Sequence, residues 1–474
     1  MDQATADLPE RLDAAQAQTA AARAAGGLAA AGCRPGDRVA ISVSSSPSLL
    51  CLVLGALCTG VVPVLLSPAL TAGERRALVD DAGPVLDLAG PDDLEAVLGG
   101  EPVPLAPCPL TRPMLYTSGT TGRPKGVWVG VWDHPTAVAH QADERQLFQP
   151  RPDDLHLVCA PTYHSAPLRA ALVTLGVGGS VAVVPRFEAG AVLEALRRLR
   201  PTTTFMVPTH LQRLLAHPAL EPEERFDSLR LLVHAGSACP PALKRAVLER
   251  VNPGVALEFY GSTEGQFTAC SDTEWLERPG TVGRARPGRR LAIEPDDTGE
   301  APAISADGHP LGVIWCHAPP FARFEYWGQP EATEAAWRGD AFSVGDLGWL
   351  DQEGYLYLAG RRGDLIITGG VNVYPAEIEA ALAGAEGVTE LAVFGVPDPE
   401  WGERVCAAVV AGPGFDVGWL ARLAAERLAP PKRPKQYVVV DELPHTASGK
   451  LLRRQLGAHA GLDPGDGVTG AHRG

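Results

Sequence analysis

The chain has 474 residues, a formal net charge of -15, and 45% hydrophobic and 20% charged residues. This length exceeds one ordinary core and predicts two or three domains of a soluble globular protein. The acidic balance argues against nucleic acid or an anionic membrane surface as the main partner.

Targeting and redox signals predict a cytoplasmic protein. Residues 1–16 are acidic and lack the apolar core of a signal peptide. The nine cysteines are scattered without a C-x-x-C pair, which favours buried, reduced thiols. The most apolar stretch, 48–66, contains Gly55, Gly60 and Pro63, so we expect a buried helix, a turn and a strand there instead of a membrane span.

From residue 36 onward, short β-branched runs alternate with Ala/Leu-rich helical stretches. The predicted strands are 37–43, 60–66, 154–161, 180–185, 203–208, 229–236 and 257–262, and predicted helices include 189–200 and 240–251. This alternation predicts an α/β fold whose largely parallel sheets are layered with helices. Ligands of such sheets bind beyond the carboxyl ends of the strands.

The pattern of glycines and of strand-like and helical segments changes near residue 360. Residues 354–383 are punctuated by Gly and then become helical, and strand-like runs at 390–396, 404–412 and 436–444 accompany a helical pattern near 417–428. We therefore expect a large N-terminal domain (1–360), a hinge (361–364), a small mobile α+β C-terminal domain (365–458) and a disordered Gly-rich tail (459–474).

The most distinctive loop is 116–127, with the sequence YTSGTTGRPKGV. Backbone N–H groups of a Gly-rich loop can converge on a phosphate, and the hydroxyl groups add donors. It is not a Walker A loop, because Lys125 precedes Gly126. The chain has five lysines against 36 arginines, and two of the five, Lys125 and Lys450, lie in Gly-containing motifs. The alternative for this segment is a flexible surface loop.

Several segments together resemble the adenylate-forming (AMP-binding) enzymes, a superfamily of acyl-CoA synthetases, adenylation domains and luciferases. Loop 116–127 resembles the phosphate loop of these enzymes, and HAGSACPP at 234–241 matches their adenine-side loop. The later core motifs follow in order at 260–265 (YGSTEG), 344–379 and 444–456 (PHTASGKLLRRQL). The resemblance covers roughly residues 25–456. Within the superfamily, the chain looks like a member of the acid–CoA ligase branch.

This resemblance implies a two-step reaction with ATP, Mg²⁺ and coenzyme A. A carboxylate would attack the α-phosphate of ATP to give an acyl-adenylate, and a thiol, usually that of CoA, would then displace AMP. The chemistry needs no protein nucleophile, because positioning and stabilisation of charge would carry the catalysis.

The resemblance also implies a role for each matched residue. The ATP phosphates would be held by Thr117, Ser118, Thr120, Thr121 and Lys125. The adenine and the α-phosphate would lie against Gly236, Ser237, Ala238, Tyr260, Gly261, Ser262 and Thr263. The carboxylate of Glu264 would bind Mg²⁺, and the ribose would meet Asp346 and Arg361. Lys450 would bridge the substrate carboxylate and ATP. Each position has an ordinary structural alternative, such as a turn residue, a core aromatic or a solvated lysine.

Two further implications concern the acid and the thiol. His164, in PTYHSAP, lies where relatives place a His or an aromatic residue between the acyl pocket and the thiol tunnel. No Asp is nearby to pair with an α-amine, so the prediction is a carboxylic acid without one, in a largely apolar pocket, and aliphatic, aromatic and polycyclic acids all stay open. The small domain would rotate between the two steps so that Gly369, Gly370 and Val371 line the CoA channel. Arg433 and Lys435 would either meet CoA phosphates or form a solvated rim.

The chain departs from its relatives in three places. Relatives usually begin with a few dozen more residues. Gly363 stands in the hinge where they often have Asp or Lys, which widens the accessible backbone range. Residues 126–138 lack a Thr/Ser-His pair. These departures leave three alternatives open: loading of a carrier-protein phosphopantetheine, thioester formation from a ready-made acyl-adenylate only, and non-catalytic nucleotide binding. The presence of Lys125, Glu264 and Lys450 argues against the last.

Overall fold

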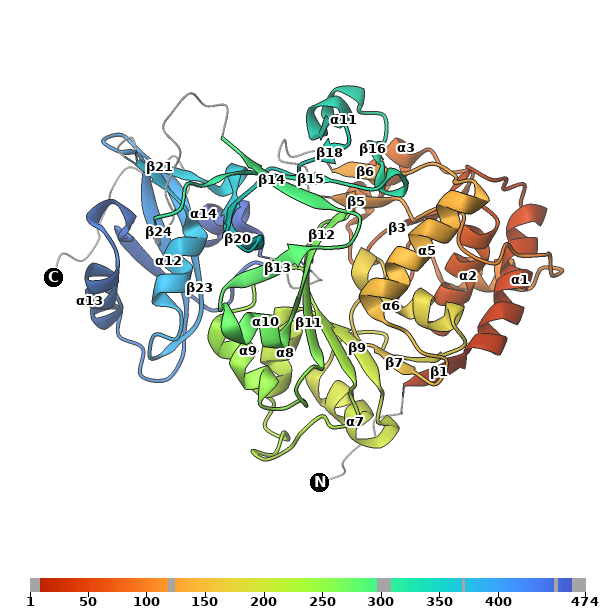
Figure 1. The fold of residues 1–474 in the computed structure, drawn as a ribbon, viewed down its shortest axis with the longest axis horizontal. Helices are drawn as coiled ribbons and strands as arrows, with labels where there is room; N and C mark the ends of the chain where they lie inside the picture. The colour runs from red at the N-terminus through yellow and green to blue at the C-terminus, as the bar shows by residue number, and fades with distance from the viewer. Residues whose placement is uncertain (1–8, 118–123, 296–307, 369–370, 447–450, 463–474) are drawn as a thin grey trace. The chain divides into compact units, whose positions relative to one another are not determined.

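The computed structural model describes residues 9–117, 124–295, 308–368, 371–446 and 451–462 (Figure 1). The chain divides into a larger unit, Met1–Cys239, Leu243–Leu291 and Cys316–Phe342, and a smaller unit, Pro240–Ala242, Ala292–Trp315 and Ser343–Gly474. Both units mix helices with sheets, so the predicted α/β class is confirmed.

The main sheet of the larger unit contains strands in the order β1-β8-β7-β9-β10-β11-β12-β13. Their bounds are β1 Glu10–Asp13, β7 Leu155–Val158, β8 Ser180–Val183, β9 Thr203–Met206, β10 Leu231–His234, β11 Ala256–Gly261, β12 Gln266–Ser271 and β13 Thr281–Ala285. Strands β8, β7, β9, β10 and β11 run parallel. Every residue of β7, β9 and β10 is buried, as expected for parallel strands covered on both faces.

Helices cover this sheet, and two smaller sheets complete the larger unit. The helices are α1 Ala14–Ala30, α2 Pro47–Cys58, α3 Ala72–Ala82, α4 Pro91–Leu98, α5 His134–Phe148, α6 Ser165–Gly176, α7 Ala189–Leu199, α8 Pro208–Leu215, α9 Pro241–Leu248, α10 Asp272–Glu277, η1 Pro320–Ala322 and α11 Pro330–Ala336. Helices α5 and α6 lie side by side (Figure 1). One small sheet is parallel: β2 Arg38–Ile41, β3 Val62–Leu65 and β4 Leu86–Leu88.

The other small sheet carries the flanks of the predicted phosphate loop. It consists of β5 (Leu115–Thr117), β6 (Lys125–Trp128) and β16 (Glu325–Tyr326) in the order β16-β6-β5. Strands β5 and β6 are antiparallel and place Thr117 opposite Lys125. The remaining short strands are β17 Trp337–Arg338 and β18 Ala341–Phe342.

The smaller unit contains an α+β sheet of the kind expected from the sequence. Its strands run in the order β22-β21-β24-β23, and β25 lies parallel to β24. The bounds are β14 Arg290–Glu294, β15 Gly312–His317, β19 Asp346–Leu350, β20 Tyr355–Arg361, η2 Arg362–Asp364, β21 Ile366–Thr368, β22 Val371–Val373, α12 Pro375–Leu382, β23 Val388–Asp398, β24 Gly402–Ala411, α13 Val417–Arg427, η3 Pro430–Lys432, β25 Gln436–Val440, η4 Arg453–Gln455 and α14 Leu456–His459. The predicted tail lies mostly outside the described residues.

Two local predictions from the sequence are confirmed. The apolar stretch 48–66 forms most of α2 and then β3, joined by a turn in which Gly60 has a φ of 77°. Within the described part of the chain, no helix is both long enough and apolar enough to span a membrane. All nine cysteines are free thiols, and all of them except Cys239 are buried.

Candidate active site

The motif YGSTEG forms the end of β11 and the tight turn into β12. The Ser262 N–H donates to the Gly265 carbonyl at 2.8 Å, which closes the turn. The two glycines are required by crowding: a Cβ on Gly261 would lie 2.9 Å from the Gly265 oxygen, and one on Gly265 would lie 2.5 Å from Phe342 Cζ. The turn therefore holds Thr263 and Glu264 in fixed positions at the end of β11.

Glu264 lies beside a tyrosine that also contacts the phosphate-loop lysine. The Tyr326 hydroxyl donates to Glu264 Oε1 at 2.9 Å, and the Glu264 residue is 6% exposed. Lys125 Nζ lies 4.6 Å from the centre of the Tyr326 ring. The β16–β6–β5 sheet produces this arrangement, because Tyr326 pairs with Val127, two residues after Lys125. Thus Lys125 and Glu264, 139 positions apart in the sequence, both contact one aromatic side chain.

The predicted adenine-side residues leave the sheet at the same edge as this turn. Strands β10 and β11 are parallel neighbours with His234 opposite Glu258, so the loops after both strands begin at their shared carboxyl edge. Gly236 has a φ of 99°, and the residues Gly236, Ser237 and Ala238 are exposed. Tyr260 packs its ring 4.7 Å from the ring of Phe267. Just below this loop, burial lowers the pKa of His234 to about 4.

His164 belongs to the same carboxyl edge. It is the N-cap residue of α6, in the segment that follows β7, and its ring lies 4.7 Å from that of Tyr163. The parallel strands β7, β9, β10 and β11 thus direct His164, the 236–238 loop and the 262–264 turn to one side of the sheet.

The predicted ribose contacts are brought together by a hairpin of the smaller unit. Asp346 begins β19, Arg361 ends β20, and the two residues are directly opposite in the ladder. Asp346 is 7% exposed. Gly363 follows within η2 and is exposed. Arg453 of η4 pairs with Asp364 at 3.6 Å and with Glu379 of α12 at 2.5 Å, which fixes η4 to the end of the predicted hinge.

Several predicted residues are only partly placed. Thr117 ends β5, and Val371 begins β22, directly opposite Thr368 in the β21–β22 hairpin. The residues outside the described part of the chain are Ser118, Thr120, Thr121, Gly369, Gly370 and Lys450. Of the two basic candidates for CoA contact, Arg433 donates instead to the carbonyls of Leu428 and Ala425 at the end of α13.

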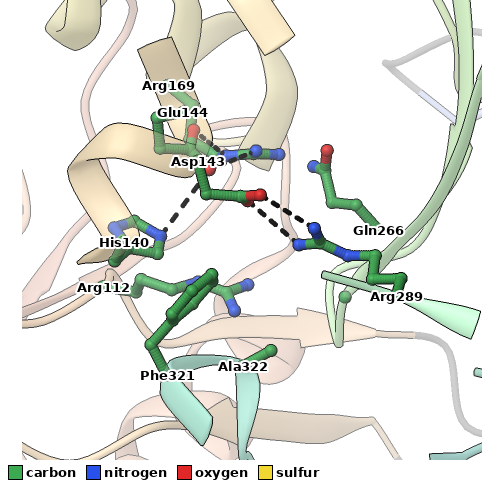
Figure 2. A pocket seen from close by; sticks show the side chains of 10 residues that line it. Arg112, His140, Asp143, Glu144, Arg169, Gln266, Arg289, Phe321 and Ala322 are labelled. Atoms are coloured by element: carbon green, nitrogen blue, oxygen red, sulfur yellow. Dashed lines mark hydrogen bonds and ion pairs between the residues drawn. The ribbon is translucent and has the colours of Figure 1, made fainter. Parts of the chain in front are cut away.

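A small charged cavity borders the C-terminal end of the 262–265 turn (Figure 2). Gly265 and Gln266 line it directly after Glu264, and Arg112 donates from Nη2 to the Thr263 carbonyl at 2.5 Å. The other lining residues come from α5, α6, η1 and the loop after β13: His140, Asp143, Glu144, Arg169, Arg289, Phe321 and Ala322. The sequence analysis singled out none of these side chains.

The chemistry of this cavity is set by buried ion pairs. Arg169 donates to both oxygens of Glu144, at 2.7 and 2.5 Å, while Asp143 accepts from Arg286 and Arg289. Burial raises the pKa of Glu144, but the charge of Arg169 outweighs this and brings it to about 2. Burial lowers the pKa of His140 to about 4, so this imidazole is neutral at neutral pH.

Comparison with known proteins identifies the class. The model described as AMP-binding enzyme matches residues 2–108 and 111–327, and that of the AMP-binding enzyme C-terminal domain matches 377–450. The chain therefore belongs to the AMP-binding enzyme family.

Its relatives are named as ligases that act on carboxylic acids. A feruloyl-CoA synthase from an Amycolatopsis species is 35% identical, with 92% of this chain and 91% of the relative covered. The fatty acid–acyl-carrier-protein ligase ScoC from Streptomyces coeruleorubidus is 33% identical, covering 92% and 89%. The structure of o-succinylbenzoate CoA synthetase from Bacillus subtilis in complex with its acyl-adenylate intermediate has a TM-score of 0.80 and 30% identity, covering 97% and 94%.

Proposed function

We propose that this chain is an ATP-dependent, AMP-forming carboxylic acid–CoA ligase. The observation that carries the proposal is that Lys125 and Glu264 both contact Tyr326. A cation beside a buried carboxylate, at the carboxyl edge of a parallel sheet, suits a nucleotide phosphate chain with its metal. The names of the relatives support the same reaction class.

In the first half-reaction, a carboxylate oxygen of the acid attacks the α-phosphorus of ATP. The bond from this phosphorus to the bridging oxygen breaks, and pyrophosphate leaves with the electron pair. Lys125, Thr117 and the 118–121 hydroxyls hold the phosphates, and Thr263 contacts the α-phosphate. Lys450 bridges the acid carboxylate and ATP. These groups act through position and charge.

Glu264 fits a magnesium ion. Its carboxylate is buried, and Oε1 accepts one hydrogen bond, from Tyr326, which orients the group and leaves Oε2 as a hard oxygen donor. The Ser262 Oγ atom is buried and makes no hydrogen bond to any residue of the described chain, so a polar ligand would satisfy it. When bound, Mg²⁺ neutralises charge on the phosphates. Among solved relatives, the B. subtilis synthetase has also been crystallised with ATP and a magnesium ion.

The nucleoside is bound by two groups of residues. Gly236, Ser237 and Ala238 form one wall of the adenine slot and Tyr260 the other. Exposed backbone with positive φ at Gly236 lets a flat base approach closely. Asp346 accepts from the ribose hydroxyls, and Arg361, directly opposite in the β19–β20 hairpin, reaches the same sugar.

In the second half-reaction, the thiol sulfur attacks the acyl carbonyl carbon. The bond from this carbon to the adenylate oxygen breaks, AMP leaves, and the thiol proton passes to solvent. His164 borders the acid and the thiol. The smaller unit alternates by a hinge at 361–364, presenting Lys450 for adenylation and residues 369–371 for thiol transfer. Gly363, exposed in η2, supplies backbone freedom for this motion.

The surface of the smaller unit favours CoA over a carrier protein. Trp401, between β23 and β24, is 45% exposed, and Lys435 Nζ lies 5.9 Å from its ring. An exposed indole beside an ammonium suits stacking on a purine and contact with a phosphate. CoA has an adenine nucleotide, whereas a protein-borne phosphopantetheine arm has none. Carrier loading and thioesterification-only activity remain as alternatives.

Mass spectrometry of reactions with ATP, Mg²⁺ and a panel of carboxylic acids tests the proposal. Acyl-AMP without CoA, and acyl-CoA with it, are expected. The Lys450→Ala variant should lose adenylation and still form thioester from a supplied acyl-adenylate. Thioester from supplied adenylates alone in the wild type would favour a thioesterification-only enzyme, and product only with a phosphopantetheinylated carrier would favour carrier loading. Absence of both products and of pyrophosphate would overturn the ligase assignment.

A further inference from the structure

The small charged cavity borders residues that the proposed ligase reaction uses. Its lining begins at Gly265, the residue after Glu264, and includes Arg169, five residues after His164 on α6. Arg112 touches the carbonyl of Thr263, the residue proposed to meet the α-phosphate. A molecule whose carboxylate reacts near Thr263 and His164 can therefore extend toward this cavity.

Positive charge is in excess around the cavity. Four guanidinium groups, those of Arg112, Arg169, Arg286 and Arg289, accompany the carboxylates of Asp143 and Glu144, and the nearby Glu264 carboxylate also acts on Arg112, so four positive charges face three negative ones while His140 is neutral at neutral pH. Arg169 uses Glu144, and Arg286 and Arg289 share Asp143. Arg112 forms no ion pair with a residue in the described part of the chain, and its one hydrogen bond goes to Thr263. Figure 2 shows its guanidinium among the lining side chains.

Two arginines have donor capacity left. The Arg289 side chain is 2% exposed, and its Nε–H is buried without a hydrogen-bond partner among the described residues. Arg112 has further N–H groups beyond the one bonded to Thr263. Burial lowers the pKa of both Arg112 and Arg286 to about 10, so both remain charged at neutral pH in a site that disfavours charge. An anion is the ligand that would satisfy such donors and balance this charge.

We propose that the acid carries a second anionic group, as a short dicarboxylic acid does, and that its distal carboxylate binds in this cavity against Arg112 and Arg289. The proposal rests on the ligase function above and names its substrate class. It replaces the apolar acid expected from the sequence. Arg169 and Arg286 hold Glu144 and Asp143 and so position the cavity wall, while Phe321 and Ala322 limit the space.

Matched pairs of acids test this assignment. Malonate, succinate, glutarate and adipate are each compared with their monomethyl esters, which keep the length and the reacting carboxylate but lose the second charge. Pyrophosphate release with ATP and Mg²⁺ gives kcat/KM for each. For the best diacid we expect a preference of roughly 30-fold or more over its ester, because the ester leaves a buried cation unpaired. Equal or faster turnover of the esters, or of apolar monocarboxylic acids, overturns the proposal.

The variant Arg112→Met separates specificity from catalysis. It keeps the length of the side chain and removes the unpaired charge, so the diacid preference should fall at least tenfold, chiefly through KM. Arg284→Met is the matched control, since Arg284 is exposed on β13 and pairs with Glu274 outside the cavity. A fall of the same factor for diacid and ester in Arg112→Met would show that Arg112 acts only on the turn, and would overturn its assigned role.

A binding measurement distinguishes failure of this inference from failure of the ligase proposal. Isothermal titration of the wild type with the diacid and its ester, in the presence of AMP, requires no turnover. If no acid is turned over but the diacid alone binds, and Arg112→Met abolishes this, the ligase assignment fails and the anion site stands. Turnover without a preference for the diacid overturns only the proposed anion site and leaves the ligase assignment in place. If chloride or inorganic phosphate binds equally well, the cavity holds an inorganic anion only, and the substrate class is wrong.

Discussion

Two charged regions next to the 262–265 turn differ in how their charges are arranged. On the nucleotide side, Lys125 and Glu264 both contact Tyr326, and the positive charge of Arg112 also acts on Glu264. On the other side, buried arginines and carboxylates form a dense network around a small cavity. The first arrangement suits a ligand that brings its own metal and phosphates, and the second suits a fixed small anion. The residues of one short turn thus border both the proposed nucleotide site and the proposed anion site.

Acid should disrupt both sides, and this is the largest effect we expect. Burial lowers the pKa of His140, at the cavity, and of His156, His210 and His234, in and around the main sheet, to about 4. The unfolded value is about 6.5, so the unfolded state binds protons first as the pH falls. Stability is therefore complete above about pH 6.5 and falls toward pH 4, by roughly 3 kcal/mol per histidine. Glu144, whose pKa falls from 4.5 to about 2 on folding, adds a further loss of stability only below about pH 4.5.

Urea unfolding at about pH 7.5, 6 and 5 measures this loss. The variant His140→Gln should reduce the pH dependence by one proton, and His134→Gln, at the exposed start of α5, should not change it. A free energy of unfolding that stays flat across this range would contradict the assigned neutral histidines.

Removing one member of the buried ion-pair network should lower the free energy of unfolding far more than removing one member of a surface ion pair does. Arg169→Met leaves Glu144 buried without its bidentate partner, and we expect a loss of about 3–5 kcal/mol in unfolding free energy. The control Arg198→Met breaks an exposed pair with Glu194, at 3.4 Å, and should cost less than about 0.5 kcal/mol. The double change Arg169→Met with Glu144→Met should regain much of the loss. Equal denaturation midpoints for the two single variants would argue against a tightly coupled network.

The nucleotide side is tested by Tyr326→Phe. This change deletes the donor to Glu264 Oε1 and leaves that buried oxygen unpaired, at a cost of about 1–3 kcal/mol. We expect adenylation to slow by roughly tenfold with every acid alike, in contrast to the acid-selective effect of Arg112→Met. Pyrophosphate release with a diacid and its monomethyl ester gives both rates. Acid-dependent losses in Tyr326→Phe would show that the two sides are not independent.

The smallest effect is expected at the proposed CoA contact. Trp401→Ala removes an exposed stacking surface worth about 0.5–1.5 kcal/mol, so the KM for CoA should rise roughly threefold to tenfold relative to the KM for ATP. Steady-state thioester formation at varied CoA measures this ratio. An unchanged ratio would mean that Trp401 does not contact CoA. The choice between CoA and a carrier protein would then depend on which acceptor gives product in the mass-spectrometry experiment.

The sequence predicted the fold class and the edge of the sheet better than the contacts within the site. Local signals were sufficient for α2 and β3, because a continuous apolar run with Gly and Pro determines them. The YGSTEG motif was placed at a strand end for the same reason. The role of Tyr326 was not predicted, because the position of its side chain depends on the pairing of β16 with β6, which lies about 200 residues earlier in the chain.

The cavity was missed for a related reason. Arg286 and Arg289 reach Asp143 across separations of 143 and 146 residues, and Arg112 reaches Thr263 across 151. In the sequence, each of these residues is an isolated charged residue in a helix or loop, and no local motif marks it. The expectation of an apolar pocket followed from this lack of a visible partner, and the matched diacids and esters test it against the proposed anion site.

The crowded glycines of the 262–265 turn have a consequence for how such enzymes diversify. Gly261 and Gly265 admit no side chain, which restricts substitution in this turn, whereas the cavity residues of α5, α6 and the loop after β13 are joined by buried ion pairs and must be exchanged together. Acid preference can therefore be changed by exchanging the cavity residues as a set, while the residues proposed to bind the phosphates stay the same.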